Sequence, residues 1–196
     1  MKILFLGDIV GDTGFQSVKN NLPNIISSNK IDFVCVNGEN AAPEGVGLTE
    51  NIANELYSAG VDVITTGNHV WDQKEIFDFI KTENKLLRPL NMKGELPGQG
   101  FSIYNSKKNL KVGVLNLMGN VFMKKCDDVF SAANEFIKKQ RNFNNFKFLI
   151  VDFHGEITSE KMAIGNLFDG YATLVVGTHT HVPTNDARIL KNGTGY

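Results

Sequence analysis

The 196-residue sequence lacks long apolar runs, and this absence excludes a membrane-spanning protein. Its uninterrupted apolar stretches are only a few residues long, far short of the roughly 20 that a transmembrane helix needs. The first residues begin like a signal peptide, but Asp8 comes too early and no small-residue cleavage site follows it. We therefore expect a cytoplasmic protein that has no membrane partner.

Cysteine is scarce, and neither sign of charge is in excess. Cys35 lies in an apolar run and Cys126 precedes a predicted helix, with no Cys or His near either at metal-ligand spacing. We expect both to be unreactive free thiols, not disulfide or zinc ligands. Lys and Arg number 20 against 21 Asp and Glu. A protein that binds long nucleic acid usually has a positively charged surface, so we expect no long nucleic acid as a partner.

What the chain does contain is an alternation of short apolar runs with helical periods, which predicts a single α/β domain. Several of the predicted strands are apolar throughout, which is typical of sheets covered on both faces. A polar turn between two runs in the second half predicts an antiparallel hairpin. The predicted strands are Lys2–Leu6, Asp32–Asn37, Val61–Thr66, Phe101–Tyr104, Lys111–Leu117, Lys147–Phe153 and Thr173–Gly177.

Local signals predict where helices begin and break. Thr49 is placed to cap one helix through its hydroxyl. Asp72 and Glu75 have the spacing of a capping box, which predicts the start of another. Pro23 is expected to kink or split the helix that follows a loop over Gly7–Gly14. Phenylalanines such as Phe77, Phe79, Phe136 and Phe148 are expected in the core, and further helices are predicted over Val129–Arg141 and Ser159–Phe168.

Side chains that can bind metals follow five of the predicted strands. Because ligands bind at the carboxyl ends of strands in open α/β sheets, we expect these side chains to share one edge. Taken singly, each has an ordinary interpretation as a core histidine, a helix cap or a turn residue. Their joint placement favours a metal site. The candidates are Asp8, Glu39, Asn40, Asn68, His69, His154, His179 and His181.

The donor types narrow the choice of metal. Imidazole, carboxylate and carboxamide groups without a thiolate fit Mn, Fe, Zn or Co better than Ca. A two-metal site needs a bridging carboxylate, and Glu39 suits this role because polar loop residues flank it at a strand end. Two such ions about 3.5–4 Å apart can activate water and clamp the oxygens of a phosphoryl group. No P-loop and no complete dinucleotide fingerprint occurs, so we expect no nucleotide cofactor site.

Five short motifs carry a resemblance to the calcineurin-like metallophosphoesterases. The sequence departs from the general pattern in two ways: no histidine follows Asp8, and Glu39 stands in place of an aspartate. With these two differences the motifs resemble one subgroup, the YmdB-like family. The motifs are Gly7-Asp8-Ile9-Val10-Gly11, Asn37-Gly38-Glu39-Asn40-Ala41-Ala42, Gly67-Asn68-His69-Val70-Trp71-Asp72, His154-Gly155 and Thr178-His179-Thr180-His181-Val182-Pro183-Thr184.

The resemblance implies a layered α/β fold with mixed β-sheets flanked by helices, and a hydrolase with two divalent metal ions. Fe or Mn would be the native metals, with Zn, Co or Mg as alternatives. His69 would bind no metal and would act as general acid toward the leaving oxygen, or stabilise charge in the transition state. Thr178 and Thr180 would either hydrogen-bond to the metal ligands or be ordinary loop residues. One ion would take Asp8, Glu39, Asn40 and His181, and the other Glu39, Asn68, His154 and His179.

The implied substrate is a cyclic nucleotide, either 2′,3′-cyclic or 3′,5′-cyclic, and the implied assembly is a homo-oligomer. Two alternatives stay open: a regulatory protein that binds a nucleotide or phosphoprotein with incidental hydrolysis, and a general phosphatase. Phe15 stands where the family usually has a basic residue, so no substrate contact is expected there. Related chains continue further, which implies that residues 1–196 are one domain, shortened at its C-terminal end.

Overall fold

The computed structural model describes residues 1–124, 126–141 and 145–196, and it contains two β-sheets that pack face to face. The first sheet has the parallel order β1-β2-β3, and the second has the order β4-β5-β6-β7. In the second sheet only β4 is antiparallel to its neighbour. The strands are β1 (Ile3–Leu6), β2 (Phe33–Asn37), β3 (Val63–Thr65), β4 (Phe101–Asn105), β5 (Lys111–Met118), β6 (Phe148–His154) and β7 (Leu174–Thr178).

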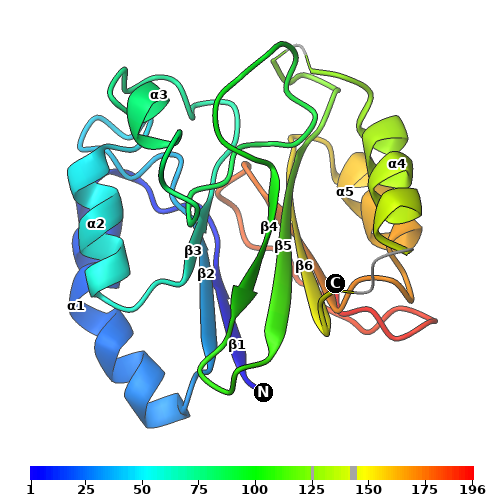
Figure 1. Ribbon diagram of the computed structural model, residues 1–196, viewed down its shortest axis with the longest axis horizontal. Helices are drawn as coiled ribbons and strands as arrows, with labels where there is room; N and C mark the ends of the chain where they lie inside the picture. Colours follow the sequence, from blue (N-terminus) through cyan, green and yellow to red (C-terminus); the bar gives the residue numbers. More distant parts are fainter. Residues whose placement is uncertain (125, 142–144) are drawn as a thin grey trace.

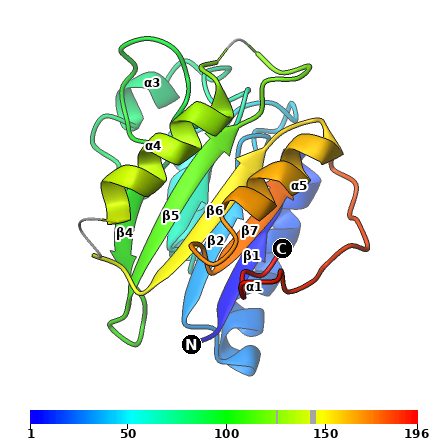
Figure 2. The ribbon, with the colours of Figure 1, turned by 90° about the vertical axis from the view of Figure 1, so that its right-hand side faces the viewer.

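Helices cover the outer face of each sheet. Figure 1 shows α1, α2 and α3 on the side of the first sheet, and Figure 2 shows α4 and α5 across the second. The predicted layered α/β fold with mixed sheets is therefore confirmed, as are the hairpin of β4 and β5 and the bounds of α4. The helices are α1 (Gly11–Asn29), α2 (Glu50–Ser58), α3 (Ile76–Phe79), α4 (Val129–Arg141) and α5 (Thr158–Leu167).

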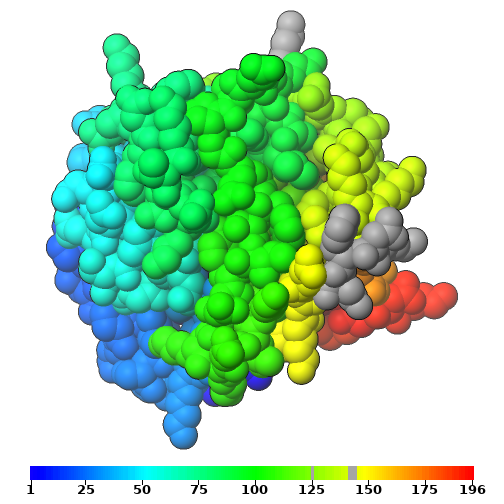
Figure 3. Space-filling view, in the orientation of Figure 1, coloured from blue at the N-terminus to red at the C-terminus, as the bar shows by residue number. Residues whose placement is uncertain are grey.

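Every residue of β2 is buried because the strand has a packed layer on each side. Phe33 and Cys35 point into the core between the sheets, and Val34 and Val36 point toward α1 and α2. Such alternation follows from the two-residue repeat of a strand and explains the unbroken apolar run. In the space-filling view, the green segments that include β4 cover the middle of one face, between the two halves (Figure 3).

The parallel strands bring their carboxyl ends to one edge of the molecule. In the first sheet Leu6 pairs with Val36, and in the second His154 pairs with both Met118 and Thr178. Both sheets therefore present their last residues and following loops on the same side. The predicted site residues lie on this edge.

Some local predictions are wrong. The alternative that Pro23 splits the helix is wrong, because α1 runs without a break from Gly11 to Asn29, and it begins inside the predicted loop. Asp72 and Glu75 form no capping box: Asp72 bonds to His69, and the Glu75 carboxylate accepts from the Glu50 backbone. The prediction of a core position for Phe77 is also wrong, because 44% of this residue is exposed. The spacing of Asp72 and Glu75 in the sequence did not reveal that both carboxylates bond to residues outside α3.

Other local predictions are confirmed. The Thr49 hydroxyl accepts from the backbone of Ile52 at 3.2 Å and caps α2. Cys35 and Cys126 are buried free thiols, and burial raises the pKa of both, for Cys126 to about 11. Both thiols are therefore poor nucleophiles. Among the described helices, none combines the length and apolar character that a membrane crossing requires.

Candidate metal centre

Three of the predicted ligands meet where β1 and β2 end and in the loop after β7. The His181 Nε2 atom lies 3.5 Å from Asp8 Oδ1 and 3.1 Å from Asn40 Nδ2. Asp8 lies two residues after β1, and Asn40 three residues after β2. We call Asp8, Asn40 and His181 the first donor group.

A second donor group consists of Asn68, His154 and His179. The His154 Nε2 atom lies 3.0 Å from Asn68 Oδ1 and 3.1 Å from His179 Nδ1. Asn68 comes from the loop after β3, His154 is the last residue of β6, and His179 follows β7 directly. The group therefore combines ligands from both sheets.

Glu39 joins the two donor groups. Its Oε1 atom lies 2.9 Å from His154 Nε2 and 3.3 Å from Asn40 Nδ2. Its Oε2 atom accepts a hydrogen bond from the backbone of His69 at 3.0 Å. The carboxylate is fully buried, so a cation is the partner that would best offset its desolvation.

The donor arrangement fits divalent cations. Two ligand atoms that each lie about 2.1 Å from one ion are separated by about 3 Å, which matches the distances around His154 Nε2. Ligand atoms of Glu39, His154 and His179 all lie within 4.8 Å of one another. Within the described residues, Asp8 Oδ1 and Asn40 Oδ1 are buried without a hydrogen-bond partner. Buried unpaired oxygens at such a place are what bound metal ions would satisfy.

Gly67 creates the space for this cluster. A Cβ atom at this position would lie 2.2 Å from His154 Cδ2 and 2.4 Å from Glu39 Oε2. No side chain larger than hydrogen fits between the carboxylate and the imidazole. The glycine before Asn68 in the sequence is therefore required by close approach.

The electrostatics of the cluster follow from Glu39 and His154. Burial acts to raise the pKa of Glu39, but the neighbouring His154 and His69 hold it below its ordinary value. Burial acts to lower the pKa of His154, yet Glu39 and Asp8 raise it above its ordinary value. The pKa of His179 is lowered, first by burial and then by His154. The cluster thus favours a positive charge at His154 Nε2, whether proton or metal.

The loop after β7 adopts unusual backbone angles at both of its histidines. His179 has a φ of 96° and His181 a φ of 52°, in a region that favours glycine. The His179 backbone N–H donates to Asp8 Oδ2 at 3.0 Å. Strain of this kind costs about 1–3 kcal/mol per residue and concentrates at functional sites. Here it turns two nearby imidazoles toward different donor groups.

His69 stands apart from both donor groups. Its Nδ1 atom lies 2.5 Å from Asp72 Oδ2, and Lys124 Nζ lies 3.6 Å from the other oxygen of this carboxylate. Partial burial acts to raise the pKa of Asp72, but His69 and Lys124 hold it below its ordinary value. Asp72 therefore stays ionised and accepts from Nδ1 of the ring, and within the described part of the chain Nε2 of His69 forms no hydrogen bond.

Sequence reasoning missed a polar network beneath His154. Asp152 is fully buried and accepts hydrogen bonds from Asn37, Thr65 and Thr178. Burial raises the pKa of Asp152 to about 6 in spite of His154 and these donors. A signal was available, because Asp152 is a charged residue in an apolar run and shares the strand face of His154, two residues on.

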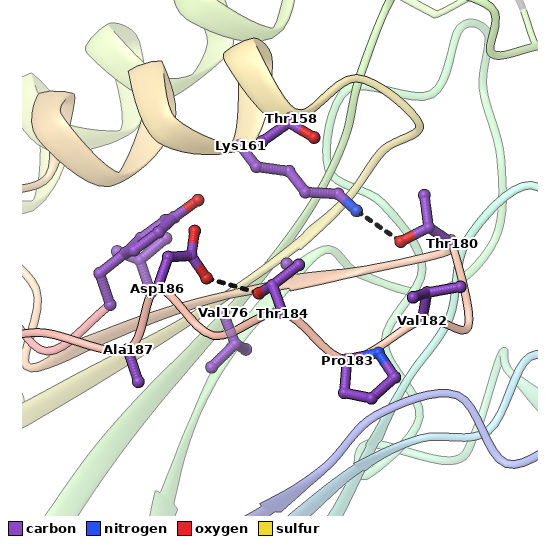
Figure 4. Close-up of a pocket in the computed structure, with 12 residues that line it drawn as sticks. Thr158, Lys161, Val176, Thr180, Val182, Pro183, Thr184, Asp186 and Ala187 are labelled. Carbon is purple, nitrogen blue, oxygen red and sulfur yellow. Dashed lines mark hydrogen bonds between the residues drawn. The ribbon is translucent and has the colours of Figure 1, made fainter.

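A hollow of about 310 Å³ opens beside the first donor group and is lined by Asp8, Thr178 and His181. A second hollow of about 240 Å³ adjoins it and shares Thr180 with it. Figure 4 shows Lys161 reaching across this second hollow to the Thr180 hydroxyl, 3.0 Å away. Small-ligand sites typically measure roughly 300–1,000 Å³, so the first hollow is large enough for a small ligand.

Comparisons with known proteins find relatives that match the whole chain. A 2′,3′-cyclic-nucleotide 2′-phosphodiesterase from Bacillus subtilis (strain 168) is 46% identical over 196 residues, which are 100% of this chain and 73% of that protein. A hypothetical protein from Thermus thermophilus has a solved structure that matches with a TM-score of 0.91 at 39% identity, covering 100% of this chain and 74% of the other.

The structure of a phosphatase from Mycoplasma pneumoniae matches with a TM-score of 0.90 at 40% identity, covering 100% of this chain and 70% of that one. The family model described as YmdB-like protein matches residues 4–196. Nearly the whole chain is thus covered by one family, in agreement with its motifs and its layered fold. The chain belongs to the YmdB-like family.

Proposed function

We propose that this protein is a phosphodiesterase that uses two divalent metal ions to hydrolyse a phosphoester bond of a cyclic nucleotide. The observation that carries the proposal is the buried Glu39 carboxylate, which contacts one donor group through Asn40 and the other through His154. A carboxylate in this position is suited to bridge two ions. The 46% identity to a 2′,3′-cyclic-nucleotide 2′-phosphodiesterase supports the choice of substrate.

The proposed ligand sets follow the two donor groups. Glu39 would be shared by both ions. Asn40 would bind metal through its side-chain oxygen. In the structure the side-chain nitrogen of Asn40 faces His181, and a rotation of the carboxamide by about 180° would exchange the two atoms. One ion would be held by Asp8, Glu39, Asn40 and His181, and the other by Glu39, Asn68, His154 and His179.

The metal ions would lower the pKa of a water molecule and neutralise charge on the phosphate oxygens. Mixed oxygen and imidazole donors without sulfur fit Fe or Mn, and they also accommodate Zn, Co or Mg. The protein's own part is to hold seven side chains in place within a largely buried cluster. That fixed geometry lowers the cost of organising the site during the reaction.

His69 has the role of general acid. Asp72 accepts from Nδ1 and orients the ring, and the doubly protonated ring can give its Nε2 proton to the departing oxygen of the substrate. Lys124 pairs with Asp72 and donates to the backbone oxygen of Asn68, which connects the acid to the second donor group.

Metal analysis of the purified protein, combined with a panel of possible substrates, tests the proposal. The panel contains 2′,3′-cyclic and 3′,5′-cyclic nucleotides, linear diesters and monoesters, each measured with added Mn, Fe, Zn, Co or Mg. We expect about two metal ions per chain and the highest kcat/KM for a cyclic nucleotide. Tight nucleotide binding without product would favour a regulatory binding protein instead, and a preference for monoesters would favour a general phosphatase.

A further inference from the structure

The buried Asp152 carboxylate ties the two sheets together directly below the metal centre. Its Oδ2 atom accepts from Asn37 Nδ2 at 3.0 Å and from Thr65 Oγ1 at 2.5 Å, both in the first sheet. Its Oδ1 atom accepts from Thr178 Oγ1 at 2.7 Å, in the second sheet. Three donors, and no exposed surface, leave this carboxylate with an entirely internal role.

The direction of these hydrogen bonds determines where the proton on His154 lies. A threonine hydroxyl has one proton, and Thr178 gives it to Asp152. The same Oγ1 atom lies 3.0 Å from His154 Nδ1, so it must accept a proton from that nitrogen. Asn37 Nδ2 lies 3.5 Å from His154 Nδ1 and is itself a donor, so it cannot take the proton. The ring is therefore protonated at Nδ1.

The opposite nitrogen of the ring faces the metal centre. His154 Nε2 lies within 3.1 Å of Glu39, Asn68 and His179, and a metal ion binds a nitrogen only through its lone pair. A proton at Nδ1 leaves that lone pair at Nε2. A negative charge that reaches the ring through the hydroxyl also makes Nε2 a stronger donor.

We propose that Asp152 is a positioning residue that acts through Thr178 to keep His154 in the form that binds metal through Nε2. This inference rests on the proposed metal site. The relay runs from the Asp152 carboxylate through the Thr178 hydroxyl to His154 Nδ1. Asp152 touches neither metal nor substrate, and its effect is carried entirely by the orientation and proton position of one ligand.

Thr65 provides a matched control, because it is a second buried threonine that donates to the same carboxylate, and among the described residues it forms no hydrogen bond with His154. Thr178→Val and Thr65→Val each replace a buried hydroxyl with a methyl group of similar size. Both should lower the thermal stability. Only Thr178→Val breaks the relay, so only this variant should strongly weaken metal binding. Thr178→Ser keeps the hydroxyl and should bind metal nearly as tightly as the wild type.

The measurement is the dissociation constant for Zn²⁺ by calorimetry, at one pH, for the wild type and the three variants. We expect Thr178→Val to bind about 10- to 100-fold more weakly, the usual cost of losing a group that orients a ligand, with Thr65→Val and Thr178→Ser below that range. Equal losses in Thr178→Val and Thr65→Val, or no loss in either, would overturn the relay.

A second measurement needs no variant and decides the question if Thr178→Val does not fold. In ¹⁵N-edited NMR spectra of the zinc-loaded wild-type protein, His154 should carry a slowly exchanging proton on Nδ1. A proton on Nε2 would overturn the proposal. A wild type that binds zinc with this tautomer but hydrolyses no phosphoester would contradict the proposed function and leave the relay intact.

Discussion

The two sheets contribute different chemistry to the same site. The first sheet and its loops supply oxygen donors, from two carboxylates and two carboxamides, whereas the second supplies three imidazoles. Neither half holds a complete set for either proposed ion. The donors from the first sheet are Asp8, Glu39, Asn40 and Asn68, and those from the second are His154, His179 and His181.

This division shows what the face-to-face packing of the sheets does for function. Oxygen donors alone would favour Mg or Ca, and imidazoles alone would favour Zn or Cu, so the combination sets the metal preference at the junction. The junction is held by Glu39 above and by Asp152 below, each of which contacts residues of both sheets. Any change that separates the two halves should therefore affect metal binding before it affects the fold.

The largest expected effect comes from removing the charge that both donor groups share. Glu39→Gln should lose metal and turnover together. Metal ions contribute several kcal/mol to stabilising the transition state, so the loss in kcat/KM should be roughly 10³-fold or more. Metal content by mass spectrometry and hydrolysis of a cyclic nucleotide measure both effects. Glu44→Gln, an exposed neighbour in the same loop, is the control. Full turnover of Glu39→Gln with two bound ions would refute the bridging role.

The addition of one methyl group should have different effects at two glycines, Gly67 and Gly7, each of which directly precedes a predicted ligand in the sequence. A Cβ atom on Gly67 would overlap His154 and Glu39, whereas a Cβ atom on Gly7 would meet nothing within 4 Å. Gly67→Ala should therefore push the two halves apart and lower turnover by at least about 10²-fold, the cost of a displacement of roughly 1 Å. Gly7→Ala should keep metal and activity. Similar results for both variants would mean that the cluster tolerates expansion.

The next effect should be confined to turnover. His69→Ala should lower kcat by about 10²- to 10⁴-fold, because a general acid is lost while all seven proposed ligands remain. Asp72→Asn should have a weaker effect in the same direction, since the ring stays but its ionic partner is lost. The ratio of kcat to bound metal is the quantity to measure. If His69→Ala turned over at the wild-type rate, or lost its metal, the assigned role would be wrong.

The strand-end rule explains why much of the site could be predicted from the sequence. A histidine after an apolar run must lie at the edge where parallel strands end, and the structure brings His154, His179 and His181 together there with Asp8, Glu39, Asn40 and Asn68. The rule gives the edge but not the partners. Which nitrogen faces Glu39 depends on Asp152, which lies far from Glu39 in the sequence.

The fold shows the same limit. Apolar runs located the strands to within one or two residues, because burial on both faces requires such runs. The capping box predicted for Asp72 and Glu75 does not form, because both carboxylates bond to residues outside α3. The left-handed backbone at His179 and His181 had no sequence signal, and at His179 it accompanies a backbone contact to Asp8, which lies far away in the sequence.

The smallest expected effect tests whether the outer helical layer can be altered without disturbing the junction. Thr49→Ala removes the side-chain cap of α2 and should cost about 1 kcal/mol, or roughly 2–4 °C in Tm for a chain of this size. Ser159→Ala in α5, whose N-cap residue Ile157 makes no side-chain cap, should change stability by less than about 0.5 kcal/mol. Metal affinity should stay at the wild-type value in both, because each substitution lies outside both donor groups. A weaker metal affinity in Thr49→Ala would show that the first sheet's helices position its oxygen donors, so the difference between the two halves would extend beyond the strand ends.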